Sequence, residues 1–143
     1  MNDPNKLNEL ISSIFSTMRL VRERSQKKHK TDPFTALQLE TLNYVTSKEQ
    51  PTMKDISNYL CVAPSSATSV VNGLVTSKKL ERVVDSTDRR IVRLIATVKG
   101  KKESQKWYLE KSERMKKTFS VLSEKEKEEL IRILEKIATA YHS

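Results

Sequence analysis

The stretch that decides the fold runs from Met53 to Thr97 and reads MKDISNYLCVAPSSATSVVNGLVTSKKLERVVDSTDRRIVRLIAT. Its pattern of apolar and polar residues predicts two short helices joined by a tight turn, and then a β-hairpin. Pro64 suits the start of the second helix, because the N–H that proline lacks is one that a helix start leaves unpaired. The spacing i, i+3, i+4, i+7 predicts a buried stripe on this helix. The stripe consists of Ala67, Val70, Val71 and Leu74.

The opposite face of the second helix is polar. It carries Ser65, Ser66, Thr68, Ser69 and Asn72. Serine and threonine are mediocre helix formers because their hydroxyl groups compete for the backbone, so their concentration on one short helix needs a reason. Short donors and acceptors suit base edges and phosphates in a major groove. For the helix alone, a solvated face of small residues is the competing interpretation.

The segment before this helix predicts its partner. Thr52 and Asp55 form a variant of the capping box, which marks the start of a first helix. Ile56, Leu60 and Val62 supply an apolar side that can pack on the second helix. The short segment between the two helices has the usual length of the turn in a helix-turn-helix.

The segment after the second helix predicts a hairpin. LERVVD and RIVRLIAT are short runs rich in β-branched residues, and they bracket a polar tip from Ser86 to Arg89. Asp88, Arg89 and Arg90 lie at the end of this tip. Because adjacent strand residues point to opposite faces, one arginine can reach into a minor groove while its neighbour pairs with a carboxylate or phosphate. The whole stretch predicts a winged helix-turn-helix that binds double-stranded DNA.

In this order, the residues resemble the MarR family of dimeric winged-helix transcriptional regulators. The resemblance covers nearly the whole chain: an opening helix, Thr35 and Gln38 at the start of a second helix, the helix-turn-helix, and the DRR wing followed by Thr97 and Gly100. The family places the inserted arginine at the second Arg of DRR. The resemblance therefore implies Arg90 as the minor-groove residue, with Arg89 as its phosphate or salt-bridge neighbour and Asp88 as the group that orients them. An Asp–Arg pair that only pins the hairpin is the alternative.

The sequence departs from the family pattern at two turns. Cys61 and Lys79 stand where the family usually has glycine. If both backbones keep a positive φ, each non-glycine residue costs ~1 kcal/mol; otherwise the turns are remodelled. On the reading helix, we expect base contacts from Ser66, Ser69 and Asn72. We expect phosphate contacts from Ser65 and Thr68.

Composition limits the class of protein. The chain has 143 residues, enough for one domain, and 27 Lys and Arg against 18 Asp and Glu leave a net charge of +9. Such a charge suits a polyanion, but membranes and RNA are polyanions too, so it supports DNA only together with the motif. No apolar run approaches the ~20 residues of a membrane span, and the start MNDPNKLNEL lacks the pattern of a signal peptide. A single cysteine agrees with a reducing compartment, so we expect a cytoplasmic protein with no membrane partner.

The two ends of the chain predict a homodimer. Residues 5–28 form a helix with one wide apolar face: Leu7, Leu10, Ile11, Ile14, Phe15, Met18 and Val21. Ser123 and Glu126 form a capping box for a last helix with a second apolar stripe: Leu130, Ile133, Leu134, Ile137 and Tyr141. Neither stripe can be hidden on so small a lobe, so we expect the ends to pack together across a two-fold axis. A polar helix over residues 98–117, anchored by Trp107, Leu109 and Met115, would act as a strut.

The predicted fold is thus mainly α with a small β-hairpin wing: a winged helix-turn-helix with six helices, dimerising through its N- and C-terminal helices. Residues 1–143 form one domain, with a DNA-binding lobe over 34–98 and dimerisation helices over 1–30 and 99–143. After the break at Asp32 and Pro33, Thr35 and Gln38 predict a capping box for the helix that carries Leu39, Leu42 and Val45. The basic run from Arg22 to Lys30, with Lys27 and Lys28, is interpreted as a solvated helix end rather than a DNA-flanking patch.

Catalytic or metal chemistry has little to build on. His29 and His142 are the only histidines, Cys61 is the only cysteine, and Gly73 and Gly100 are the only glycines. Metal sites and phosphate-binding loops need clustered residues of these types, so we expect no metal, no cofactor and no enzyme activity. A reactive thiol at Cys61 could draw on the helix start at Pro64, but a small buried residue is the simpler interpretation.

The resemblance also implies an effector pocket between the dimer helices and the DNA-binding lobe, for a small anionic aromatic or lipophilic molecule. Met18, Tyr44 and Trp107 are candidates for its lining, and ordinary packing is the favoured alternative for all three.

The expected function is a homodimeric, sequence-specific repressor that binds a pseudo-palindromic operator and is released by such an effector. Two rivals are a non-specific architectural DNA-binding protein and a winged-helix module that binds other proteins. The polar face of the reading helix and the intact DRR argue against both, because neither rival needs them.

Overall fold

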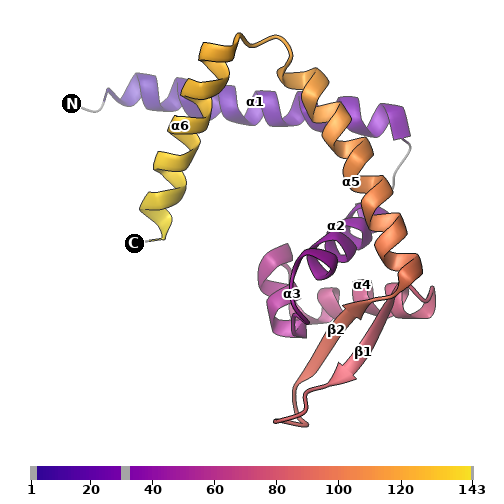
Figure 1. The fold of residues 1–143 in the computed structure, drawn as a ribbon. Coiled ribbons are helices and arrows are strands. Elements are labelled where there is room, and N and C mark those ends of the chain that lie inside the picture. The colour runs from indigo at the N-terminus through magenta and orange to yellow at the C-terminus, as the bar shows by residue number, and fades with distance from the viewer. Residues whose placement is uncertain (1–2, 30–32, 143) are drawn as a thin grey trace. The chain divides into compact units, whose positions relative to one another are not determined.

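The computed structural model describes residues 3–29 and 33–142, and the side chains of residues 3–24 and 35–142. The elements follow the order α1 (Pro4–His29), α2 (Pro33–Ser47), α3 (Met53–Leu60), α4 (Pro64–Thr76), β1 (Leu80–Val84), β2 (Val92–Ala96), α5 (Val98–Phe119) and α6 (Glu124–Tyr141) (Figure 1). The expected class, mainly helical with six helices and one hairpin, is confirmed. The chain divides into two compact units, Glu23–Glu110 and the pair Met1–Arg22 with Lys111–Ser143.

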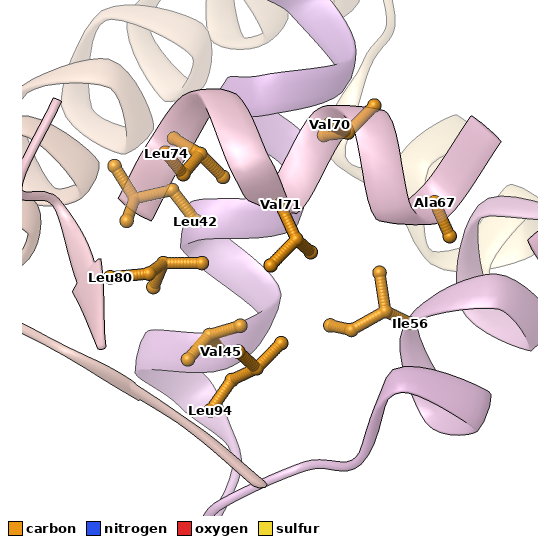
Figure 2. Packing of buried hydrophobic residues seen from close by; sticks show 9 residues of the cluster. All are labelled: Leu42, Val45, Ile56, Ala67, Val70, Val71, Leu74, Leu80 and Leu94. Carbon is orange, nitrogen blue, oxygen red and sulfur yellow. The ribbon is translucent and has the colours of Figure 1, made fainter. Parts of the chain in front are cut away.

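One aliphatic core holds the Glu23–Glu110 unit together. Figure 2 shows its nine buried side chains, which come from α2, α3, α4 and both strands: Leu42, Val45, Ile56, Ala67, Val70, Val71, Leu74, Leu80 and Leu94. All four residues of the predicted stripe on α4 belong to it, so that prediction is confirmed. The stripe fixes which side of α4 faces inward, and therefore which side is left for solvent or a ligand.

The helix-turn-helix begins and turns largely as its sequence predicts. The hydroxyl of Thr52 accepts from the Asp55 N–H at 3.2 Å, and the Asp55 carboxylate accepts from the Thr52 N–H at 2.9 Å, which completes the capping box. Hydrogen bonds from the backbone and side chain of Thr52 hold the pKa of Asp55 below its ordinary value. The helix ends at Cys61, whose left-handed φ of 52° confirms that this turn keeps the conformation usually given to glycine.

The start of α2 differs from the prediction. The helix begins at Pro33, so Thr35 lies inside the first turn and the expected capping box of Thr35 and Gln38 is wrong. Proline suits the first helical position because its φ is already helical and its missing N–H needs no partner there. Asp32 lies outside the described residues. Along the helix Leu42 and Val45 are buried as expected.

The hairpin is confirmed, but its second strand starts later than expected. The strands are antiparallel, with Leu80 opposite Ala96 and Val84 opposite Val92. Because β2 begins at Val92, Arg89 and Arg90 lie in the turn, and the argument that strand alternation sends them to opposite faces is wrong. The polar tip is longer than the sequence pattern indicated.

Thr97 hydrogen-bonds both to the turn between α4 and β1 and to the first turn of α5. The Thr97 hydroxyl donates to the carbonyl of Lys78 at 2.7 Å and accepts from the Gly100 N–H at 3.1 Å. A Cβ on Gly100 would lie 2.1 Å from the carbonyl oxygen of Lys79, which leaves no room for a side chain. The positive φ of this turn, 61°, belongs to Lys78 and not to Lys79, so of the two alternatives left open for Lys79 the remodelled turn is the one found.

The first half of α5 is held by small residues rather than by the expected anchors. Gly100 and Ser104 are buried, and the Ser104 hydroxyl donates to the Asn43 side chain of α2 at 3.4 Å. Trp107 is only half-buried, and Leu109 is 56% exposed, so Leu109 is not an anchor. Buried positions on this helix are thus filled by Gly100 and Ser104, which a pattern of large apolar residues does not reveal.

The unit made of Met1–Arg22 and Lys111–Ser143 keeps its apolar side chains at the surface of the single chain. On α1, the exposed ones are Leu7, Leu10, Ile11, Ile14, Phe15, Met18 and Leu20; on α6 they are Ile131, Ile133, Leu134, Ile137 and Tyr141. The capping box of Ser123 and Glu126 at the start of α6 is confirmed. The lysines of the basic run, Lys27, Lys28 and Lys30, and also His29, lie outside the residues whose side chains are described.

Candidate nucleic-acid interface

The candidate surface is the outer side of α4. Its five polar residues are all exposed, and we call them the reading face: Ser65, Ser66, Thr68, Ser69 and Asn72. The helix reads PSSATSVVNGLVT and contains no charged residue. The reading face therefore offers neutral donors and acceptors, and any positive charge near it has to come from other elements.

The beginning of α4 is suited to an anion. The residue before it, Ala63, has no side-chain oxygen to cap the helix, and Pro64 occupies the first position. The first N–H groups of a helix have no acceptor within the helix, and the helix dipole is positive there. The backbone of Ser65 and Ser66 can therefore donate to a phosphate without displacing a side-chain cap.

The reading face is not uniform in what it can donate. The Thr68 hydroxyl donates to the Pro64 carbonyl at 2.9 Å, so in this rotamer its oxygen can only accept. Phosphate oxygens also only accept, so the expected phosphate contact of Thr68 requires another rotamer. The hydroxyls of Ser66 and Ser69 make no such bond within the described residues, so their protons can serve an outside acceptor.

One cation lies against the reading face. A guanidinium Nη2 of Arg82, in the middle of β1, donates to the side-chain oxygen of Asn72. Arg82 was not among the site residues predicted from the sequence. The signal that could have found it is the alternation of β1, in which Arg82 shares a face with Leu80, a buried residue of the core that α4 covers.

Two carboxylates, Asp85 and Asp88, hold the tip of the wing, and only Asp88 was predicted from the sequence. The Asp85 carboxylate accepts from the Thr87 hydroxyl at 2.7 Å, the Thr87 N–H at 2.8 Å and the Asp88 N–H at 3.0 Å. It also accepts from Nε of Arg93 at 2.5 Å. The Thr87 hydroxyl first, and then Arg93, hold the pKa of Asp85 well below its ordinary range. Asp85 is therefore the centre of a hydrogen-bonded turn.

The DRR motif has a pairing that differs from the expected one. The Asp88 carboxylate accepts from Nε of Arg90 at 3.1 Å, from its Nη2 at 3.2 Å and from its backbone N–H at 3.0 Å. Arg89 makes no ion pair within the described residues, so Arg90, not Arg89, is the salt-bridge partner. The Arg90 side chain is 91% exposed, so its guanidinium is both oriented by Asp88 and open to solvent.

Cys61 is exposed, and the expectation of a small buried residue is wrong. Its thiol lies 3.5 Å from the Asn58 carbonyl, to which it donates. The left-handed backbone of this residue turns the chain between α3 and α4. The turn lies at the surface, so the side chain of Cys61 stays exposed.

Of the three residues considered for an effector pocket, Tyr44 and Trp107 lie in the Glu23–Glu110 unit. Tyr44 stacks on Tyr59, with ring centroids 4.1 Å apart, and Tyr59 donates to Glu40 at 3.2 Å. Met18 belongs to the other compact unit and is 54% exposed. A hollow of ≈300 Å³ in the Glu23–Glu110 unit is lined by residues around Lys48, Ile95 and Lys101.

Within residues 3–29 and 33–142, His, Cys, Asp and Glu form no group of three or more that could hold a metal ion. None of the described helices combines the length and the apolarity needed to span a membrane.

Known structures place this geometry in a family of folds. A MarR family protein from Bacillus stearothermophilus is 18% identical, with all of both chains covered and a TM-score of 0.84. The transcriptional regulator BldR from Sulfolobus solfataricus is 25% identical over 98% of this chain and 99% of its own, with a TM-score of 0.77. Streptococcus pneumoniae FabT, solved in complex with DNA, is 23% identical over 98% and 96%, with a TM-score of 0.67. No sequence model of a protein family matches the chain, and no curated protein matches it in sequence. The chain therefore has the winged helix-turn-helix fold of the MarR-family transcriptional regulators.

Proposed function

We propose that this protein is a sequence-specific transcriptional regulator of the MarR family that binds double-stranded DNA as a homodimer. In this proposal α4 enters the major groove and the wing enters the adjacent minor groove. The lobe over residues 34–98 binds DNA, and the terminal helices form the dimer. Repression, and release by a small anionic or lipophilic effector, are further expectations from the family resemblance.

The observation that carries the proposal is the division of α4 into two faces. Every residue of the apolar stripe is buried and every residue of the reading face is exposed, so a helix of small polar groups stands on a rigid core. Direct reading of bases requires such groups within reach of the base edges. A protein that binds DNA only by charge would be expected to place lysine and arginine on this helix, and α4 has none.

The wing supports the same proposal. Its tip is ordered by Asp85 and Asp88, and it presents the arginines of DRR next to each other at the surface. A narrow minor groove concentrates negative potential, which attracts a guanidinium. FabT, one of the proteins with this fold, was solved in complex with DNA.

The homodimer is supported by the exposed apolar residues of α1 and α6. Leu10 and Phe15 on α1, and Leu134 and Ile137 on α6, are 51–69% exposed in the single chain. Such a large apolar surface on a small protein marks an interface. A second copy of the same chain is the occupant that suits it, because the same surface occurs on both partners of a two-fold dimer.

Selection of binding sites from a pool of random duplexes tests the function. We expect enrichment of an inverted repeat whose half-sites lie about one helical turn, ~10 base pairs, apart from centre to centre. Enrichment of no sequence, despite binding to the pool, would favour the architectural rival. No binding at low salt would favour the protein-interaction module.

A further inference from the structure

The contact between Arg82 and Asn72 links the wing to the reading face by side chains. Arg82 is the central residue of β1, opposite Leu94 of β2, and Leu94 is fully buried. The strand places Arg82 on the same face as Leu80, one step further from the core. From there its guanidinium reaches the side chain of Asn72 near the end of α4.

The chemistry of the contact fixes the amide of Asn72. A guanidinium has only donors, so the group of Asn72 that it meets has to be the oxygen. The oxygen is thereby turned toward β1, and the NH2 group is the end that has no partner within the described residues. Arg82 is in no ion pair within that part of the chain, so no carboxylate competes for its guanidinium.

This arrangement changes what Asn72 can read. A free asparagine pairs with adenine in two places, because its oxygen accepts from the adenine amino group while its NH2 donates to N7. The oxygen keeps a second lone pair, but the guanidinium places a positive charge and further donors where the adenine amino group, itself a donor, would have to lie. Guanine presents only acceptors in the major groove, N7 and O6, and these suit the NH2 of Asn72 beside the remaining N–H groups of Arg82.

We propose that Arg82 is a specificity-determining residue: by holding the oxygen of Asn72, it makes the pair present donors only, and donors select the acceptors of guanine over the amino group of adenine at the base pair that they face. The inference rests on the proposed function and names a base preference within it. It also places a positive charge against the uncharged α4.

Site selection with the full-length protein and four variants tests the inference. Asn72→Ala identifies the base position that depends on Asn72, and the parent protein should prefer guanine there. Arg82→Met keeps much of the aliphatic stem and removes the donors, so the ratio of adenine to guanine at that position should rise at least about fivefold. The double variant N72A/R82M should have the same ratio of adenine to guanine as Asn72→Ala alone. Glu81→Met, an exposed neighbour on the other face of β1, should leave it unchanged.

A ratio between sequences separates this role from a phosphate contact, because a lost phosphate contact weakens all sequences alike. The parent protein gives a second measurement that is independent of any variant. On the selected site, inosine in place of guanine keeps N7 and O6 and should keep the affinity, whereas 7-deazaguanine should lose at least about fivefold.

Three results would overturn the inference while leaving the proposed function standing: a parent preference for adenine at the position, an unchanged ratio in Arg82→Met, or no position that depends on Asn72. If the parent protein enriches no sequence at all, the proposed function itself fails and the inference falls with it.

Discussion

At the scale of single residues, Gly100 stands where the structure leaves no room for a side chain. A Cβ there would lie 2.1 Å from the backbone oxygen of Lys79 and 3.1 Å from the Leu42 side chain. Because backbone has to move, Gly100→Ala should lower the free energy of unfolding by about 1–3 kcal/mol. Urea denaturation measures the change. Lys101→Ala, at the next and exposed position, serves as the control, and an equal loss in both variants would contradict the explanation.

At Lys78 we expect a substitution to change the stability in the opposite direction. Its φ of 61° strains a residue with a side chain, so Lys78→Gly should raise the free energy of unfolding by ~1 kcal/mol. Lys79→Gly should lower it, because Lys79 has no positive φ and its ammonium lies 2.8 Å from the Glu103 carboxylate. Thermal unfolding of the two variants compares neighbouring lysines directly. A higher free energy of unfolding in Lys79→Gly and a lower one in Lys78→Gly would contradict the strain at Lys78 and place it at Lys79.

Sequence alone located these special residues only in part. Thr97, Gly100 and the glycine-like turn at Cys61 came from a family pattern, and all three have a physical reason in the structure. The turn before β1 was left open between two alternatives, and Cys61 was wrongly expected to be buried. Both concern local backbone direction, which the residue type does not determine unless glycine or proline stands there.

At the scale of elements, the tip of the wing depends on ionised Asp85. Its folded pKa lies below its ordinary value, so its hydrogen bonds stabilise the fold at any pH above the unfolded pKa of about 3.9. The stabilisation is lost as the pH falls through the lower folded pKa. The urea midpoint of Asp85→Asn should therefore lie below that of the parent at pH 5, and the two should converge at lower pH. A difference that stays constant down to pH 2 would contradict the role of Asp85.

We also expect the two arginines at the tip of the wing to affect DNA binding differently. Arg90→Ala should weaken binding most on sites with A·T-rich flanks, because a narrow minor groove has the stronger negative potential. Arg89→Ala, next to it in the same turn, should weaken all flanks alike and reduce the slope of log K against log salt by ~0.9, as loss of one phosphate contact does. Fluorescence anisotropy on paired duplexes measures both. If Arg90→Ala binds every flank like the parent, the Asp88–Arg90 pair only pins the hairpin.

Elements defined by local chemistry were the easiest to predict. The capping boxes at Thr52 and Ser123 each need two side chains three residues apart, and both are present. The same pattern at Thr35 was misleading because Pro33 already starts the helix. Strand alternation places Arg82 on the face of Leu80, but its contact with Asn72 also depends on how β1 packs on α4, which no local pattern contains.

At the scale of the whole molecule, the prediction is a dimer that depends on apolar residues of α6. Leu134 and Ile137 are 56% and 51% exposed in the single chain. The double variant L134E/I137E should be a monomer at micromolar concentration by light scattering, because charged side chains cannot enter an apolar interface without a large penalty. Lys136→Glu changes the charge of the same helix outside this stripe and should stay dimeric. A parent protein that is itself monomeric at that concentration would contradict the prediction.

The terminal helices could be predicted from the sequence because their apolar excess is visible without any contact. The second copy of the chain stays a prediction, since burial of an apolar face is non-directional and does not name its partner. Specificity at the interface depends on the shapes of both surfaces, and the sequence of one chain lists only the side chains.

The absence of charge on α4 has a consequence for how such a protein can change over time. In the proposed function, the charged side chains that would hold the phosphate backbone stand on other elements, so a substitution of Ser66 or Ser69, the serines expected to contact bases, would alter which operator is preferred without removing a positive charge. A lineage can therefore drift from one operator to another through intermediates that still bind. Arg82 limits this change, because any residue that replaces Asn72 has to be compatible with the guanidinium beside it.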